Sequence, residues 1–391
     1  MPVINRIAEF HTEMTEWRRD FHMHPEIGFE EVRTSAVVAE KLRDFGCDEV
    51  HTGIAKTGVV GVIRGSGTSS RAIGFRADMD ALPITEQTGK PWASTIPGKM
   101  HACGHDGHTT MLLGAAKYLA ETRNFDGTIY LVFQPAEENL AGGEVMVKEG
   151  LFERFPMDRI FGMHNWPGMP AGTFLHAPGP VMAAVANLEA TITGVGAHGA
   201  MPHNGVDPIL AAAQIVTALQ SIVARNVNPL EAGVITIGHI GGGHTFNVIP
   251  EEVRLLGTAR WFLPEVGDLL ETRFKEIVTG IAAAMGCRAT CSFTRSYPAT
   301  VNEAESTELA ARAARTVVGE ARTRPLPQPT MGGEDFAFML NEKPGAYLFL
   351  GGSTGGTDAM VHHPKYDFND EILPVGASWF ATLAEQLLKR G

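Results

Sequence analysis

The sequence has no excess of basic residues and few cysteines. Lys and Arg number 32 against 44 Asp and Glu, which gives the 391 residues a formal net charge of −12. An acidic chain without a basic cluster is a poor partner for nucleic acid or an anionic membrane surface, so we expect neither. The four cysteines, Cys47, Cys103, Cys287 and Cys291, are too scattered for a disulfide framework.

Long apolar segments are lacking as well. The first thirty residues contain no apolar stretch like that of a secretory leader. We also expect no uncharged run of the length that a bilayer requires. These features predict a cytoplasmic protein. With 44% hydrophobic and 19% charged residues, the chain is long enough for two domains with separate cores.

The first part of the chain alternates between strand and helix patterns. A helix is expected over residues 31–46 and another over 109–121, because their apolar residues recur at helical spacing. Short apolar runs predict strands at 59–64, 72–77, 128–134 and 159–164. This order is typical of an α/β domain, in which helices flank a sheet that is at least partly parallel.

A second pattern begins near residue 185. Its predicted elements follow the order βαββαβ of a ferredoxin-like domain, at 188–195, 208–224, 233–240, 253–260, 264–286 and 288–294. The chain then returns to the first pattern, with a helix at 305–318, a strand at 346–352 and a helix at 372–390. We therefore expect one domain of residues 1–185 and 299–391, with residues 186–298 inserted into it.

The segment HACGHDGHTT holds the densest group of possible metal ligands. Cys103, His105 and His108 lie within six positions at the start of a predicted helix. Thiolate and imidazole are natural ligands for zinc and similar ions. Taken alone, the segment fits equally well a buried cysteine beside two structural histidines.

Other strand ends carry matching side chains. Glu137 and Glu138 follow one predicted strand and His164 ends another, where an α/β sheet normally collects its ligands. His362 and His363 lie far along the chain and could complete the coordination. A lone Glu pair is more often a solvated turn. Together, however, a Cys, several His and carboxylates at strand ends of one domain predict a metal site.

These residues belong to a longer set of motifs. The set resembles the hippurate hydrolase branch of the metal-dependent aminoacylase and carboxypeptidase family, which includes the indole-acetyl-amino-acid hydrolases. The resemblance spans nearly the whole chain, in order, and rests on RRDFHMHPEIGFEE, RADMDALPI, MHACGHDGHT, FQPAEE, MHNWP, GAHGAMPH, NVIP…GTAR, GGEDFAF and HHPKYDFND. It implies a metallopeptidase-like catalytic domain and an inserted dimerisation, or lid, domain.

The resemblance also implies a site with two divalent metal ions, zinc, manganese, cobalt or nickel, bridged by Cys103. The further ligands that it implies are His105, Glu138, His164 and His362. His362 is preferred to His363 because the family places this ligand two residues before a proline, here Pro364. Relatives carry a ligand in a His-x-Asp element that reads Asp78-Met79-Asp80 here. Asp78 is therefore not expected to bind metal, whereas Asp80 would orient the site from outside the ligand set.

The remaining roles come from the same resemblance. Glu137 would be the general base for a water that the metals activate. His198 would reach the active site of the partner subunit in a homodimer and stabilise the oxyanion. Asn247 and Arg260 would grip the substrate carboxylate. His22, His24 and Glu26 match a motif that we interpret as structural, and chemistry alone gives no role to Glu334 and Asp335.

The expected activity is hydrolysis of the amide bond of an N-acyl amino acid to a carboxylic acid and a free amino acid. Three alternatives remain open. A metallo-dipeptidase would share every motif. A metal-free amidase would use Cys103 as nucleophile. A binding protein without activity would keep the fold and the metals. The sequence does not specify the acyl group, the amino acid or the metal.

Overall fold

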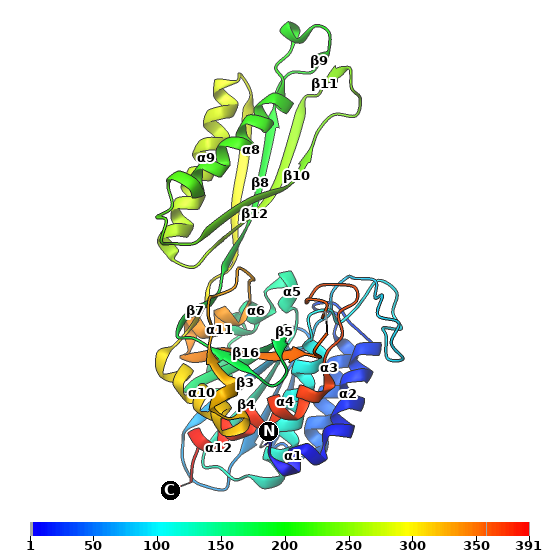
Figure 1. Cartoon of the computed structure of the whole chain (residues 1–391), viewed down its shortest axis with the longest axis vertical. Coiled ribbons are helices and arrows are strands. Elements are labelled where there is room, and N and C mark those ends of the chain that lie inside the picture. The colour runs from blue at the N-terminus through cyan, green and yellow to red at the C-terminus, as the bar shows by residue number, and fades with distance from the viewer. Residues whose placement is uncertain (1–2, 357, 391) are drawn as a thin grey trace. The chain divides into compact units, whose positions relative to one another are not determined.

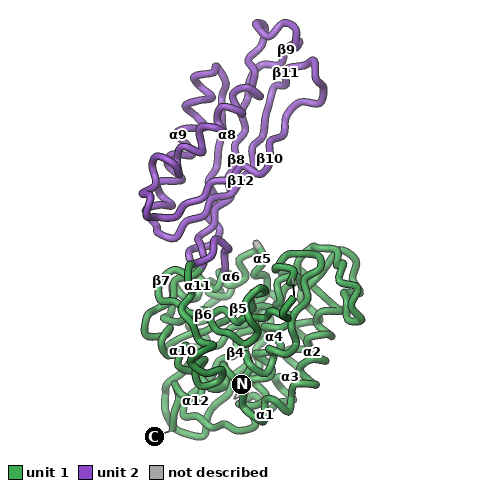
Figure 2. The backbone as a smooth tube through the Cα atoms, viewed as in Figure 1, with its two compact units in different colours: residues 1–181, 300–328, 335–391 green, residues 182–299, 329–334 purple. Residues whose placement is uncertain are grey.

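The chain forms two compact units in the computed structural model, which describes residues 3–356 and 358–390. Unit 1 comprises residues 1–181, 300–328 and 335–391, and unit 2 comprises 182–299 and 329–334 (Figure 2). The second unit thus begins four residues earlier than the expected insertion and ends one residue later. It also gains the segment 329–334, which the sequence analysis had assigned to the first domain.

Unit 1 is built around an eight-stranded mixed sheet with the order β1-β2-β4-β3-β5-β16-β6-β15. Its central strands β4, β3, β5 and β16 run parallel to their neighbours within this group, whereas β2 pairs antiparallel with both β1 and β4. β7 and β14 form a separate two-stranded sheet. The strands are β1 Glu49–Ile54, β2 Gly58–Arg64, β3 Ala72–Asp78, β4 Thr128–Gln134, β5 Arg159–Pro170, β6 Phe174–His176, β7 Gly179–Met182, β14 Thr300–Asn302, β15 Thr323–Pro325 and β16 Gly345–Ser353.

Helices cover this sheet (Figure 1). They are α1 Asn5–Glu9, α2 His11–Met23, α3 Val32–Asp44, α4 His105–Thr122, α5 Glu137–Leu140, α6 Gly142–Lys148, α7 Leu151–Arg154, α10 Ala304–Val318, α11 Phe336–Glu342 and α12 Leu373–Leu387. Short 3₁₀ turns lie at η2 Glu320–Arg322 and η3 Asp370–Ile372. The predicted mixed or partly parallel sheet flanked by helices is therefore confirmed.

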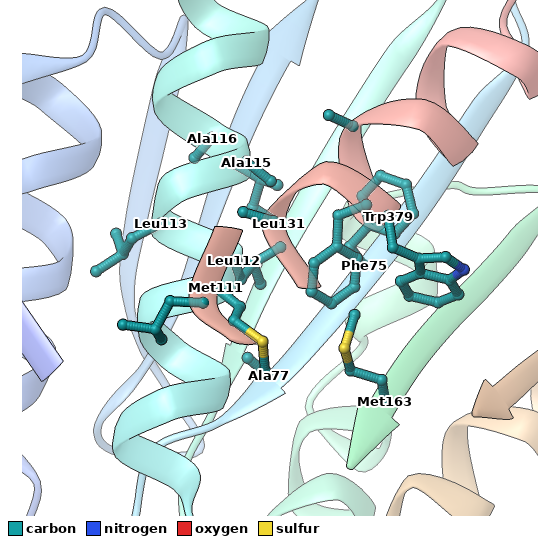
Figure 3. Close-up of a cluster of buried hydrophobic side chains, with 14 of the residues drawn as sticks. Phe75, Ala77, Met111, Leu112, Leu113, Ala115, Ala116, Leu131, Met163 and Trp379 are labelled. Carbon is teal, nitrogen blue, oxygen red and sulfur yellow. The ribbon is translucent and has the colours of Figure 1, made fainter. Parts of the chain in front are cut away.

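Strand β3 lies in the core of unit 1. All seven of its residues are buried, which is typical of a strand covered on both faces. Phe75 and Ala77 of β3 lie against Met111 and Leu112 of α4 and Trp379 of α12 (Figure 3). This packing fixes the carboxyl end of β3 and the amino end of α4, the two places from which the site is built.

Unit 2 follows the predicted order βαββαβ. Its sheet has the order β10-β12-β8-β13, all antiparallel, and the helices are α8 and α9. Alternate residues of β8 are buried, which places one face of the sheet on the core. The elements are β8 Ala184–Thr193, α8 Pro208–Arg225, β10 Gly233–Gly241, β12 Glu252–Trp261, α9 Pro264–Ala284 and β13 Arg288–Tyr297.

Unit 2 also contains a small ribbon that the sequence analysis missed. β9 Ala197–His198 pairs with β11 Val248–Ile249, and the 3₁₀ turn η1 Pro202–Asn204 follows β9. The ribbon continues beyond the end of β8 at Thr193 and before the start of β12 at Glu252. It therefore extends the four-stranded sheet at one end (Figure 1).

Helix α8 departs from the expectation about apolar segments. Its 18 residues have a mean hydropathy of 1.3, so by length and composition it could cross a membrane, and it is the one such helix in residues 3–356 and 358–390. Asp207 caps its first turn by accepting hydrogen bonds from the backbone N–H groups of Ile209 and Leu210. One face, including Ile215 and Leu219, lies in the core of unit 2. The packing is thus that of an amphipathic core helix.

Candidate metal centre

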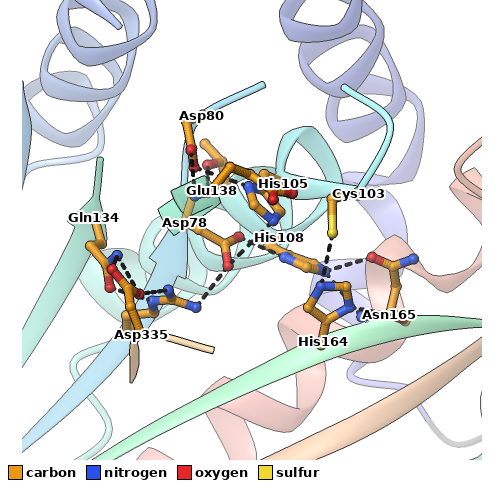
Figure 4. A network of polar contacts seen from close by, with 12 residues as sticks. Asp78, Asp80, Cys103, His105, His108, Gln134, Glu138, His164, Asn165 and Asp335 are labelled. Atoms are coloured by element: carbon orange, nitrogen blue, oxygen red, sulfur yellow. Dashed lines mark hydrogen bonds and ion pairs between the residues drawn. The ribbon is translucent and has the colours of Figure 1, made fainter. Parts of the chain in front are cut away.

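The carboxyl ends of three parallel strands bring the candidate residues of unit 1 together. β3 ends at Asp78, β4 ends at Gln134 just before Glu137, and β5 carries His164. Helix α4 begins at His105, directly after Gly104. Because parallel strands end at one edge of a sheet, side chains that are distant in sequence converge there (Figure 4).

One group of donor atoms consists of Cys103, His105 and His164, and its atoms all lie within 4.8 Å of one another. The Cys103 Sγ atom is 3.3 Å from Nε2 of His164. Between the cysteine and His105, Gly104 has φ 96°, and a Cβ there would lie 2.2 Å from Oδ1 of Asn165. Glycine at this position therefore lets the cysteine and the start of the helix face one point.

A second group consists of Cys103, Glu138 and His362, again with all donor atoms within 4.8 Å. The Glu138 Oε1 atom lies 3.1 Å from Nε2 of His362. Its neighbour His363 accepts a hydrogen bond at Nδ1 from the backbone N–H of Lys365, at 3.0 Å. The geometry thus favours His362 over His363, and Cys103 is common to both groups, as a bridging ligand would be.

Asp80 holds both groups in place. One carboxylate oxygen lies 3.1 Å from Nδ1 of His105, and the other accepts a hydrogen bond of 2.9 Å from the backbone N–H of Glu138. The Nε2 atom of His105 is buried and makes no hydrogen bond among the described residues. Oδ2 of Asp78 lies 3.8 Å from this nitrogen. A buried histidine that is oriented through Nδ1, with no hydrogen bond at Nε2, fits a metal ligand.

His108 and Asp78 are held by other partners. His108 Nδ1 lies 2.6 Å from Oδ1 of Asp78, and its Nε2 lies 2.7 Å from Oδ1 of Asn165. Asp78 also accepts a hydrogen bond of 2.7 Å from Arg76. Both ring nitrogens of His108 are therefore engaged, which fits a structural role. Asn165, which also donates to the Tyr366 hydroxyl, was missed because only its neighbour His164 has a side chain typical of metal ligation.

The electrostatics of the site suit cations. Burial favours neutral His105, but Asp78 and Asp80 outweigh burial and raise the pKa of its imidazole to about 10. Burial and the nearby carboxylates of Glu138 and Glu137 raise the pKa of the Cys103 thiol. Negative charge concentrated around buried donors of this kind fits divalent metal ions.

Glu137 is the first residue of α5 and is buried. Its carboxylate lies within 4.8 Å of donor atoms of both His105 and Glu138. The residue before it, Ala136, has φ 54°, which is the left-handed region. This turn brings the adjacent carboxylates of Glu137 and Glu138 close to the same donor atom of His105.

His22 of the amino-terminal motif and Asp335 contact residues next to the candidate ligands and next to the turn of Glu137. His22 Nδ1 lies 2.8 Å from Asp106, the neighbour of His105. Burial alone would lower the pKa of His22, but its contacts with Asp106 and Glu86 raise it to about 9. Asp335 accepts hydrogen bonds from Gln134 at 2.8 Å and from the backbone N–H of Gly143 at 2.7 Å.

Glu26 and His24 of the amino-terminal motif make contacts away from the metal centre. Glu26 accepts hydrogen bonds from the backbone N–H groups of Arg33 and Thr34 at the start of α3, and so acts as a cap. His24 contacts the backbone oxygen of Asp20 at 2.8 Å. Both contacts are structural. Glu334 is buried, and its carboxylate forms a group with those of Glu137 and Asp335, in which one oxygen of each lies within 4.8 Å of the others.

Unit 2 places its candidate residues at two separate ends. His198, in β9, is exposed and accepts a hydrogen bond from the backbone N–H of Ala200. Asn247 lies beside it, since its backbone oxygen accepts the N–H of Gly199 at 2.7 Å. Arg260, in β12, pairs with Val185 near the start of β8.

The separation of these ends follows from the register. Val185 and Thr193, the β8 partners of Arg260 and Glu252, are eight residues apart, so Arg260 lies roughly 25 Å from the ribbon end. A small molecule cannot bridge that distance. Within one copy of unit 2, Arg260 and His198 therefore cannot contact the same small substrate.

Comparisons with known proteins agree with this architecture. The family described as peptidase family M20/M25/M40 matches residues 74–386. Hippurate hydrolase of Campylobacter jejuni is 42% identical over the full length of both chains, and N-acetylcysteine deacetylase of Bacillus subtilis is 38% identical over 97% of this chain and 98% of its own. A Bacillus subtilis structure described as a dinuclear metal-binding peptidase of the M20 family superposes with a TM-score of 0.83. It is 35% identical over 98% of this chain and 99% of that one.

Proposed function

The chain belongs to peptidase family M20/M25/M40, and on that premise we propose that it is a metal-dependent amidohydrolase of N-acyl amino acids. The reaction yields a carboxylic acid and a free amino acid. The observation that carries the proposal is that two donor groups share Cys103, while the buried carboxylate of Glu137 lies beside them. A base next to a two-metal centre is an arrangement that can hydrolyse an amide, because the metals activate water and the base removes its proton.

The donor groups and the dinuclear relative support two divalent metal ions. Cys103, His105, His164, Glu138 and His362 would hold them, and Cys103 is the residue shared by the two donor groups. When bound, the ions would polarise the amide carbonyl and lower the pKa of water. This mixture of thiolate, imidazole and carboxylate accepts zinc, manganese, cobalt or nickel, so metal supply would decide among them.

Glu137 would move the proton. Its carboxylate takes a proton from the attacking water and returns it to the amine nitrogen as the C–N bond breaks. Without that transfer, the amine would leave as an anion, which is too basic to expel. Glu138 cannot do the same, because its carboxylate faces His362 at 3.1 Å.

Cys103 is a poor nucleophile in this setting. Burial and its acidic neighbours raise the pKa of the thiol, so the metal-free protein holds little thiolate near neutral pH. A metal-free Cys103 amidase would also leave the roles of Glu137 and Glu138 unexplained. The metal-dependent reaction is therefore favoured over the cysteine mechanism.

Recognition of the substrate would involve both ends of unit 2. We assign the substrate carboxylate to Arg260 and Asn247 and the developing oxyanion to His198. Arg260 of one copy lies roughly 25 Å from the ribbon end that carries both His198 and Asn247, so a site that uses all three needs His198 and Asn247 from a second copy. This separation supports a homodimer in which His198 serves the partner's site. We further propose that the enzyme acts in the cytoplasm and has no nucleic-acid or membrane partner.

Unit 2 has a surface suited to that dimer. β10 is an edge strand, which leaves backbone N–H and C=O groups without a neighbouring strand. Ile240 on this strand and Ile209 and Leu210 on α8 are about half exposed. Pairing of two copies through this edge would cover both the strand and the apolar side chains.

Mixing two inactive variants tests the shared site. His198→Ala and Glu137→Ala subunits are each expected to be inactive alone. In a mixed dimer, one of the two sites receives both native residues, so random exchange should restore about a quarter of wild-type activity. If the mixture remains inactive while mass analysis shows mixed dimers, His198 acts within its own chain.

Hydrolysis of a substrate panel tests the function itself. Chelator-stripped protein would be assayed with and without zinc or manganese on N-acetyl, N-benzoyl and N-indole-acetyl amino acids and on free dipeptides. The proposal expects metal-dependent release of amino acid from the acyl substrates. Preference for dipeptides would assign a dipeptidase instead. Activity that survives complete metal removal would contradict the proposal.

A further inference from the structure

The turn that carries Glu137 has an unfavourable backbone. Ala136, before the helix α5, has φ 54°, and Ala141, after it, has φ 55°. Residues with a Cβ rarely adopt this left-handed region, because the Cβ crowds the carbonyl oxygen. The surrounding structure must therefore hold the turn in place. A backbone hydrogen bond of 2.9 Å from the N–H of Gly142 to the oxygen of Ala136 spans the turn.

Glu31 supports this turn through a side-chain hydrogen bond. It is fully buried, and its Oε1 atom accepts a hydrogen bond of 2.8 Å from the backbone N–H of Ala136. Pro135 has no N–H, so this bond anchors the last donor before Glu137. The second oxygen of Glu31 accepts a hydrogen bond of 2.6 Å from the Thr57 hydroxyl, which fixes the direction of the carboxylate.

The segment that contains Glu31 is packed directly onto the turn. A Cβ on Gly28 would lie 2.9 Å from both Cα and Cβ of Ala136, so only glycine permits this approach. The same segment bonds to the chain just after Asp80, since the backbone N–H of Ala81 donates to the oxygen of Glu26 at 2.8 Å. Residues 26–31 therefore touch both of the chain segments that orient the site.

We propose that Glu31 is a positioning residue for the general base: by binding the Ala136 N–H, it fixes the left-handed turn and hence the place of the Glu137 carboxylate. The inference rests on the proposed function, because it takes Glu137 as the base. It assigns to the HPEIGFEE motif a role in turnover beyond stability. The side chain touches neither substrate nor metal and acts through one backbone hydrogen bond.

Two substitutions separate this bond from the bulk of the side chain. Glu31→Leu keeps the size but removes the acceptor, so kcat should fall about 100-fold, as expected for a displaced catalytic group. KM and the content of two metal ions should stay within about twofold, because Asp80 still holds the Glu138 backbone. Glu31→Gln retains an acceptor oxygen for Ala136, so its kcat should recover to within about threefold of wild type.

Glu26→Ala is the matched control. Glu26 lies on the same segment, but its side chain bonds to Arg33 and Thr34 and not to the turn. This variant should lower the melting temperature and leave kcat within about twofold. The inference is overturned if Glu31→Leu behaves like Glu26→Ala, or if Gln and Leu lower kcat equally. Those results leave the proposed function intact, which fails only if wild-type protein lacks metal-dependent hydrolysis or Glu137→Gln retains it.

Discussion

Substitution of Asp80 should weaken metal binding although Asp80 is not proposed as a ligand. Its two oxygens hold Nδ1 of His105 at 3.1 Å and the backbone N–H of Glu138 at 2.9 Å, and the side chain is buried. Asp80→Ala frees one ligand from each donor group. Loss of such supporting bonds typically lowers metal affinity 10- to 100-fold, which corresponds to about 1.4 to 2.7 kcal/mol.

Asp80→Asn is the more informative variant, because it keeps the shape. Its single carbonyl oxygen can accept from only one of the two donors. If the amide NH₂ faces His105, it donates to Nδ1 and forces the ring proton onto Nε2, where a metal ligand needs a lone pair. If instead the NH₂ faces the Glu138 N–H, two donors oppose each other. Either way, we expect at least a tenfold loss of affinity.

Competition with a chromophoric zinc chelator would measure this loss for the wild type and both variants. The unfolding free energy of each metal-free protein, from urea titration, controls for general damage. Affinity within twofold of wild type in both Asp80 variants would refute the reasoning that Asp80 orients the ligands.

Two further predictions follow from the pKa values of the site. Metal binding near pH 7 should release one proton each from Cys103 and His105, because the pKa values of both groups are raised in the metal-free protein. Calorimetry in buffers of different ionisation enthalpy should detect about two released protons. Detection of none would contradict the ligand assignment. The folded-state pKa of His22, about 9, exceeds its ordinary value of 6.5. Its stabilising effect is therefore complete below pH 6.5 and lost as pH rises through 9, by at most about 3 kcal/mol. Urea unfolding of metal-free protein at pH 6 and 9.5 should show a smaller pH effect in His22→Gln, and an equal effect would dismiss this role.

Much of the fold followed from the sequence because its signals are local. The apolar run that forms β3 predicts a buried strand without knowledge of its neighbours. Asp207 and Pro208 mark the start of α8 through a side-chain cap and a proline in the first turn. The βαββαβ order of unit 2 was likewise readable from the order of periodic segments.

The β9–β11 ribbon was not predictable in this way. Each strand has two residues, which is too short for an alternating pattern, and their pairing joins positions about fifty residues apart. The segment 329–334 was also assigned to the first domain, because its composition does not show that it belongs to unit 2. Both features depend on contacts between distant residues.

The candidate site shows the same division. Cys103, His105, Glu138 and His164 stand out because their side chains are known metal donors at strand and helix ends. The supporting contacts do not, since the bond between Glu31 and Ala136 joins residues 105 positions apart. Nothing about a glutamate before a helix indicates that it binds the turn of a distant base.

The most direct test of the account is the activity of Glu137→Gln with its metals in place. The amide has nearly the shape of the carboxylate but cannot accept the proton of the attacking water. The account predicts two divalent ions per chain by elemental analysis, an unchanged melting temperature and a kcat lowered by about 10² to 10⁴ on the best acyl amino acid. A fully metallated Glu137→Gln protein that hydrolyses this substrate at the wild-type rate would contradict the central claim.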